Sequence, residues 1–420
     1  MALPPLPDVP FTLTDVTIPG CFLGQDDALV RTNLSIADGQ ITEAAHRPVP
    51  MGGAMVLPCF VDMHTHLDKG HIWPRSPNPD GTFLGALTTV RADHAAWTPE
   101  DLRPRIAFSL KSAYAHGTRA IRTHLDSMNG QYAHSWPLFA EMRAEWAGRI
   151  DLQAVCLVSC EGVSADGEFV QIADTVAAHA GTLGMVSYPV PDLQERLDLF
   201  FNMAAARGLA ADFHVDETMD PGSETLRMIA ETVLAKGFDA PVVVGHCCSL
   251  STQDEARALD TLDLVAKAGI HVVSLPMCNL YLQDRHAART PRGRGITLVH
   301  EMKARGIPVS FASDNTRDPF YAYGDMDMLE VMRQATRIGH LDHSDTDWPL
   351  AFSTTPAATC GFDAPSLAPG APADLVICSA REWTELFARP QSDRIVIRDG
   401  RAIDTALPDY AELDHLMEPA

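Results

Sequence analysis

Hydrophobic and polar residues alternate in two different ways along the chain. Near the N-terminus, residues 11–18 alternate with a period of about two, as strands with one buried face do, and Pro19-Gly20 ends the run. The turn signal Asp38-Gly39 then leads into another short apolar run. Residues 1–57 therefore predict short strands, which we expect to begin a small β-domain.

From about residue 56 to residue 340 the pattern changes to apolar runs separated by longer amphipathic segments. Such alternation is typical of strands connected by helices, and caps, prolines and glycines bound several of the helical segments. The expected helices run from Pro99 to Gly117, from Asp192 to Gly208, from just after Ser251 and Thr252 to Gly269 and from 296 to 305. The expected strands are 56–64, 119–126, 151–159, 183–188, 209–215, 241–246, 270–275 and 307–313.

Eight strands that alternate with helices predict a closed (β/α)₈ barrel. An open doubly wound sheet is the alternative, but no glycine-rich dinucleotide-binding sequence follows the first strand. After about residue 360 the chain returns to short strands, at 373–378 and 394–398, which we expect to complete the N-terminal sheet. We therefore expect an α/β protein with a TIM-type barrel over residues 58–360 and a small β-sandwich domain built from residues 1–57 and 361–420.

Composition and charge exclude several classes of protein. The chain has 420 residues, of which 46% are hydrophobic and 21% charged, as in ordinary globular proteins. Its formal net charge of −23 argues against nucleic acid or an anionic membrane as a partner. The 9 cysteines show no CxxC spacing and no signal peptide or membrane span is recognisable, so we expect reduced thiols and a cytoplasmic location.

Metal-capable residues stand where four of the predicted strands end. The first strand leads into His64 and His66, which are two residues apart and point to the same face of an extended chain. The fifth, sixth and eighth strands lead into His214, His246 and Asp314. Because the active sites of such barrels lie at the carboxyl ends of the strands, we expect these side chains to meet. Imidazoles and a carboxylate suit Zn²⁺, Fe²⁺, Mn²⁺ or Co²⁺.

Glu217 follows His214 by three residues, close to the expected metal but not needed as a ligand. A metal ion lowers the pKa of bound water and supplies hydroxide near neutral pH, and a neighbouring carboxylate can carry the proton to a substrate. The alternative for Glu217 is a carboxylate at a helix start, where the helix dipole favours it. We expect the proton-transfer role.

Four motifs resemble those of the amidohydrolase superfamily and in particular its cytosine deaminase branch. They are HxH at 64–66, HxDE at 214–217, GH at 245–246 and SD at 313–314. The stretches VDMHTHLDK, RTHLD, NLYLQDR and PADLVI support the resemblance, which runs over nearly the whole chain. The family therefore implies a hydrolytic deaminase. In that reaction hydroxide attacks a ring carbon that bears an amino group, and ammonia departs.

The resemblance also implies roles for single residues. Glu217 would protonate the ring nitrogen and then the leaving amine, and His246 would orient the hydroxide and stabilise the tetrahedral intermediate. Binuclear relatives use a lysine at the end of the fourth strand, and residues 183–188 contain none, so one divalent ion is expected, Zn²⁺ ahead of Fe²⁺ or Mn²⁺. The implied metal ligands are His64, His66, His214 and Asp314, and Asp314 also counts with Glu217 and His246 as catalytic.

Two departures from the cytosine deaminases concern the substrate. Cys160 stands in the place of a glutamine that reads the amide edge of the pyrimidine, and a thiol cannot form an amide's paired hydrogen bonds. Asn315 stands where a second aspartate often follows the metal ligand. We therefore expect a larger or differently substituted ring, such as a pterin or an isocytosine-type 2-amino-4-oxo heterocycle. The remaining candidate substrate-binding residues are Lys69, His124, Asn279 and Phe320.

Other functions stay open at this point. Cytosine itself is one alternative substrate. Hydrolysis of a ring amide, as in hydantoinase-like enzymes, is an alternative reaction, and release of ammonia would distinguish a deaminase from it. A protein that binds the metal without catalysis is a third class, against which Glu217 and His246 argue. Superfamily relatives are often oligomers, so a homo-oligomer is also an open expectation.

Overall fold

The computed structural model describes residues 3–417, which form two compact units. In the described part of the chain, no helix combines the length and the apolar character that a membrane span requires. The predicted domain boundaries, the cytoplasmic location and the homo-oligomer stay predictions. Unit 1 contains the described residues of Met1–Asp62, Leu110–Ala120 and Met326–Pro408, and unit 2 those of Met63–Ser109, Ile121–Asp325 and Asp409–Ala420.

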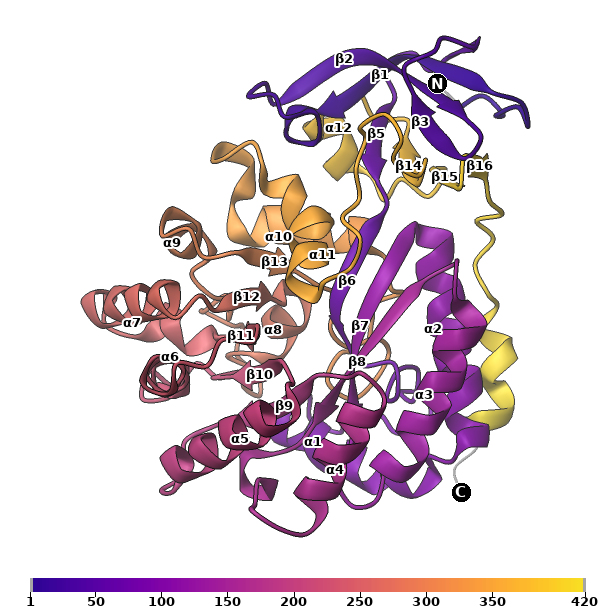
Figure 1. The fold of residues 1–420 in the computed structure, drawn as a ribbon. Helices are drawn as coiled ribbons and strands as arrows, with labels where there is room; N and C mark the ends of the chain where they lie inside the picture. Colours follow the sequence, from indigo (N-terminus) through magenta and orange to yellow (C-terminus); the bar gives the residue numbers. More distant parts are fainter. Residues whose placement is uncertain (1–2, 418–420) are drawn as a thin grey trace. The chain divides into compact units, whose positions relative to one another are not determined.

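Unit 1 contains an eight-stranded sheet to which both ends of the chain contribute (Figure 1). The strand order is β16-β15-β14-β5-β1-β2-β3, and β4 pairs with β1. C-terminal β14 pairs antiparallel with N-terminal β5, for example through Val376 and Leu57. A two-layered sandwich stays a prediction. The strands are β1 (Phe11–Pro19), β2 (Leu29–Ala37), β3 (Gln40–Thr42), β4 (Arg47–Pro50), β5 (Met55–Pro58), β14 (Leu375–Cys378), β15 (Ile395–Arg398) and β16 (Arg401–Ala402).

Eight further strands follow the predicted runs and lead to the candidate site residues. Five of them pair in parallel in the order β13-β12-β11-β10-β9, and three form a sheet in the order β6-β7-β8. Isolated parallel bridges join Ser159 to Val186 and Thr65 to Asp314. The strands are β6 (Phe60–Thr65), β7 (Thr118–Asp126), β8 (Asp151–Leu157), β9 (Leu183–Ser187), β10 (Ala211–Val215), β11 (Val242–His246), β12 (His271–Ser274) and β13 (Val309–Phe311).

The apolar run predicted as one strand over 56–64 is two strands in the structure. The ladder breaks at Cys59, whose backbone N–H donates to the carbonyl of Asp374. β5 pairs with the sheet of unit 1, whereas β6 pairs with β7. A continuous apolar pattern cannot show this change of partner, because both strands are buried on both faces.

Two predicted helices appear with nearly the expected ends, at Pro99–His116 and Leu193–Arg207. The helix expected after Ser251 and Thr252 begins at Glu255, because these two residues end a 3₁₀ turn and Asp254 caps the helix. Helices α5, α6, α7 and α9 lie along one side of strands β9–β13 (Figure 1). The helices are α1 (Phe83–Asp93), α2 (Pro99–His116), α3 (Tyr132–Trp146), α4 (Glu168–Ala178), α5 (Leu193–Arg207), α6 (Thr225–Lys236), α7 (Glu255–Lys267), α8 (Pro276–Leu282), α9 (Val299–Ala304), α10 (Met328–Gly339), α11 (Thr354–Cys360) and α12 (Trp383–Ala388).

Candidate active site

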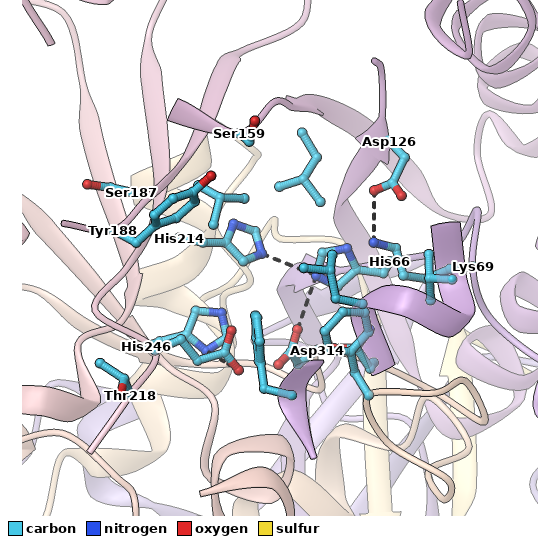
Figure 2. A pocket seen from close by; sticks show the side chains of 18 of the residues that line it. His66, Lys69, Asp126, Ser159, Ser187, Tyr188, His214, Thr218, His246 and Asp314 are labelled. Atoms are coloured by element: carbon cyan, nitrogen blue, oxygen red, sulfur yellow. Dashed lines mark hydrogen bonds and ion pairs between the residues drawn. The ribbon is translucent and has the colours of Figure 1, made fainter. Parts of the chain in front are cut away.

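Three imidazoles and one carboxylate converge where β6, β10 and β13 end. Nε2 of His64 lies 3.1 Å from Nε2 of His214, which in turn lies 3.3 Å from Nε2 of His66. Oδ1 of Asp314 lies 3.2 Å from Nε2 of His66 and 3.6 Å from Nε2 of His64. All four residues are buried. Figure 2 shows the side chains of His66, His214 and Asp314 pointing toward one another.

This arrangement fits a divalent metal ion. Ligand atoms about 2.1 Å from one ion at tetrahedral angles lie about 3.4 Å apart, and the four converging atoms are separated by 3.1 to 3.6 Å along the measured edges. Burial, and then nearby histidines and Lys69, hold the pKa of His64, His66 and His214 well below its usual value. The three imidazoles are therefore neutral, which is the form that binds a metal.

The backbone at the strand ends adopts conformations that are uncommon for side chains other than glycine. His246 has φ 69° and Asp314 has φ 65°, both in the left-handed region. Gly245 lets β11 pass close to His64, since a Cβ there would lie 3.0 Å from Cε1 of His64. Strained backbone and close packing of this kind are found where a site fixes the direction of its side chains.

Glu217 and His246 lie beside the four converging residues and share a partner. Oε1 of Glu217 is 3.4 Å from Nδ1 of His246, and the amide nitrogen of Asn279 lies 3.2 Å from the former and 2.9 Å from the latter. Burial and then the charge of Asp314 raise the pKa of Glu217 well above its ordinary value. Burial, followed by His124, lowers the pKa of His246 to about 3, so this imidazole is neutral. A carboxyl with a raised pKa is suited to proton transfer near neutral pH.

These groups open into a cavity of about 610 Å³ within unit 2. Sites for small molecules have volumes of about 300 to 1,000 Å³, so this cavity is large enough for one such molecule. His66, His214, His246, Glu217 and Asp314 all line it. Figure 2 shows Lys69 and Asp126 on one side of these residues and Tyr188 on another.

Three of the predicted substrate-binding residues line the cavity, namely Lys69, Asn315 and Phe320. Nζ of Lys69 donates to Oδ1 of Asp126 at 2.8 Å and lies 5.6 Å from the centre of the Phe320 ring. Asn315 donates to Oδ2 of Asp318 at 2.7 Å. The structure therefore brings these three residues to the reacting groups.

The other three predicted substrate-binding residues are not among the residues that line the cavity. Cys160 is buried and its Sγ lies 3.9 Å from the carbonyl oxygen of Tyr188, so the structure does not bring the thiol to the substrate space. The ring of His124 lies beside the converging residues, with ring centres 4.0 Å apart between His124 and His64. One of its ring nitrogens lies within 4.8 Å of ring nitrogens of His64, His66 and His214. Asn279 reaches the site only through Glu217 and His246.

One cavity wall was missed by the sequence analysis. Helix α1 and the turn after it contribute several lining residues, among them Arg91 and His94, and Nε2 of His94 lies 2.9 Å from Oδ2 of Asp126. A local signal for the helix does exist, because Thr82 precedes the apolar residues and its hydroxyl accepts from the N–H of Gly85. No local pattern shows that the helix faces the cavity.

Comparisons with known proteins agree with this geometry. Residues 165–404 match the model of the amidohydrolase family. The chain is 50% identical over 419 residues to the pterin deaminase of Rhizobium rhizogenes, and the matched region covers 96% of each of the two chains. The structure of 5-methylcytosine deaminase from Klebsiella pneumoniae liganded with 5-fluorocytosine is similar with a TM-score of 0.79 and 26% identity, over 95% of this chain and 98% of that one.

A third relative extends the similarity of the fold. N-isopropylammelide isopropylaminohydrolase from Burkholderia multivorans has a TM-score of 0.74 at 24% identity and covers 95% of this chain and 100% of its own. At that identity the likeness concerns the fold alone. The comparisons thus extend over both units of the chain and not only over the strands that carry the site.

Proposed function

Because the chain belongs to the amidohydrolase family, we propose that it is a metal-dependent hydrolytic deaminase of a pterin or a closely related 2-amino-4-oxo heterocycle. The observation that carries the proposal is the meeting of His64, His66, His214 and Asp314 with Glu217 at one cavity. The choice of ring is supported by the 50% identity to a pterin deaminase over 96% of the chain. Cys160 no longer enters this choice, because it does not line the cavity.

We also propose that strands β6–β13 form one closed (β/α)₈ barrel. Two isolated bridges support closure, since Ser159–Val186 joins the end of β8 to β9 and Thr65–Asp314 joins β6 to the end of β13. In a barrel all eight strands end at one face, which accounts for the convergence of residues that lie far apart in the sequence.

The divalent ion would be held by His64, His66, His214 and Asp314, whose ligand atoms converge. We take it to be Zn²⁺, because three imidazoles and a carboxylate suit this ion; Fe²⁺ and Mn²⁺ are the other candidates. When bound, the ion supplies a nucleophile by lowering the pKa of water. The remaining steps fall to the side chains of the chain itself.

Glu217 moves the protons in this mechanism. Water adds its oxygen to the ring carbon that carries the amino group, and Glu217 delivers a proton of that water first to the adjacent ring nitrogen. The second proton reaches the amino group by the same carboxyl, the carbon–nitrogen bond breaks, and ammonia leaves a ring carbonyl behind. His246 accepts a hydrogen bond at Nδ1 from Asn279, so it can present Nε2–H to the oxygen that adds.

Ammonia release by metal-replete protein tests this function, with pterin, isocytosine, cytosine and hydantoin as substrates. We expect ammonia and an equal amount of the dioxo product from pterin, with kcat/KM at least about tenfold above that for cytosine. Cytosine as the fastest substrate would overturn the ring class but not the reaction. Hydrolysis of hydantoin without ammonia release from any aminated ring would overturn the reaction itself.

A further inference from the structure

Helix α1 and the turn that follows it present one continuous face to the cavity. The lining residues on this segment are Phe83, Leu87, Val90, Arg91 and His94. Their spacings of four, three, one and three residues place them along one side of a helix. We call this side the α1 face, and it joins three apolar side chains to two that can carry positive charge.

Polar contacts fix both ends of α1. Before the helix, Asn78 donates from Nδ2 to the carbonyl oxygen of Pro319 at 3.0 Å. At its last residue, Asp93 accepts from Arg75 at 2.8 Å and from the indole nitrogen of Trp97 at 2.8 Å. A helix held at both ends keeps its cavity-facing side chains in place, so the α1 face is a fixed wall of the site.

The charged residues on this side of the cavity differ in their partners. Lys69 and His94 both contact Asp126, at 2.8 and 2.9 Å. Arg91 is exposed although it lines the cavity, which places it at the opening. Among residues 3–417 its guanidinium has neither a hydrogen bond nor an ion pair. An acidic chain thus leaves one guanidinium unpaired at the entrance to its candidate active site.

We propose that Arg91 is a specificity-determining residue that binds an anionic substituent, such as a carboxylate, on the part of the substrate remote from the reacting amino group. This inference rests on the proposed function and names the substrate class more closely. A guanidinium forms two parallel hydrogen bonds to a carboxylate, which a neutral substituent cannot accept in the same way. Arg91 therefore selects for charge and not only for size.

The size and charge of the site support a substituted ring. A cavity of about 610 Å³ is in the range typical of drug-sized ligands, and a bare two-ring heterocycle is smaller than these. Phe83, Leu87 and Val90 add apolar surface to the cavity that Arg91 also lines. A net charge of −23 repels anions in general, so a local unpaired cation is needed to hold one at this entrance.

The position of Arg91 also has a purely structural explanation. It lies in the last turn of α1, where a cation stabilises the helix dipole. That explanation predicts a change in stability and the same change in activity for every substrate. Substrate binding by Arg91 predicts a change in the preference between charged and uncharged substrates. This difference separates the structural explanation from the binding explanation.

The test compares pterin with pterin that carries a carboxylate at carbon 6, in wild type, Arg91→Met and Arg91→Lys. Arg207→Met is the matched control, because Arg207 lies in the last turn of α5 and does not line the cavity. We expect Arg91→Met to lower kcat/KM for the carboxylated substrate by about tenfold, mainly through KM, with a much smaller loss on pterin. Arg91→Lys should recover part of the loss.

The role of Arg91 would be overturned if Arg91→Met lost kcat/KM equally on both substrates and so kept the wild-type preference for the carboxylated pterin. It would also be overturned if Arg207→Met changed that preference as much as Arg91→Met does. Thermal unfolding of each variant shows whether the helix dipole accounts for a uniform loss. If wild type releases ammonia from neither pterin, the proposed function fails first. If wild type deaminates both pterins and the Arg91 variants keep the wild-type preference between them, the deaminase function stands and only the role of Arg91 fails.

Discussion

Asn279 donates a hydrogen bond from its amide nitrogen to Nδ1 of His246 at 2.9 Å. An amide nitrogen can only donate, so Nδ1 accepts and the neutral imidazole carries its proton on Nε2. Nε2 is buried and has no hydrogen-bond partner among the described residues, although His246 lines the cavity. Asn279 thus sets the tautomer that the proposed role of His246, donation to a reacting oxygen, requires, although Asn279 itself does not line the cavity.

Replacing Asn279 tests this coupling. In Asn279→Asp the carboxylate would accept from Nδ1–H and so remove the proton from Nε2, and we expect kcat to fall about a hundredfold or more. Asn279→Ala removes the partner without enforcing the wrong tautomer and should cost about tenfold. Steady-state ammonia release and metal analysis provide the measurement. Loss of metal, or a smaller effect of Asp than of Ala, would show that Asn279 has a different role.

Removing one converging imidazole should remove the metal. His214→Ala leaves three of the four proposed ligands, and we expect its metal content to fall well below one ion per chain. A ligand that binds only the folded state raises stability, so added Zn²⁺ should raise the unfolding temperature of wild type and not that of the variant. Exposed His134→Ala is the control. If added Zn²⁺ raised the unfolding temperature of His214→Ala as much as that of wild type, the ion would bind elsewhere.

Gly245→Ala probes the packing behind the site. The new Cβ would lie 3.0 Å from Cε1 of His64, so the ring must move by a few tenths of an ångström. We expect metal affinity to fall about tenfold, as for other changes that misdirect a ligand. In the control Gly70→Ala the added Cβ would lie at an ordinary 3.4 Å from Ser109. Competition with a chelator measures the metal affinity of both variants. Equal metal affinities of Gly245→Ala and Gly70→Ala would mean that β11 shifts and the His64 ring stays in place.

The positions of the site residues along the chain were predictable because they depend on the spacing of hydrophobic residues, which marks the strands, and on the parallel order of those strands. Apolar runs that end in His64, His214, His246 and Asp314 mark strand ends, and parallel strands bring their carboxyl ends to one side. Glu217 was expected there for the same reason. The structure places all five residues together.

What the sequence could not show is the direction of side chains beyond the strand ends. Cys160 begins a 3₁₀ turn and its Sγ lies 3.9 Å from the carbonyl oxygen of Tyr188, an orientation that a resemblance in sequence cannot show. Asn279 bonds to Glu217 and His246 across long sequence separations. Arg91 reaches the cavity only because distant contacts hold α1 there.

His71 should make the protein less stable in acid. It packs against Phe108, with ring centres 4.7 Å apart, and burial followed by Arg317 and Arg105 lowers its pKa to about 3. Below the unfolded pKa of about 6.5, only the unfolded chain takes up the proton, so stability is lost as pH falls from about 6.5 toward 3. His71→Phe should therefore gain about 2 kcal/mol relative to wild type between pH 7 and pH 5.

Denaturant unfolding at the two pH values measures this change, with His134→Phe as the exposed control. The comparison is between pH values within each variant, so any fixed cost of the larger ring cancels. The same difference between His71→Phe and wild type at pH 7 and at pH 5 would show that His71 does not resist protonation.

Glu217→Gln tests most directly whether a buried carboxyl beside the four proposed metal ligands drives the deamination. The substitution keeps the shape of the side chain and its contact with Asn279 but cannot transfer a proton. Ammonia release from pterin and metal content are measured on the same preparations of wild type and variant. We predict unchanged metal content and a loss of ammonia release by about a thousandfold or more. Release near the wild-type rate, or loss of the metal together with the activity, would contradict the role assigned to Glu217.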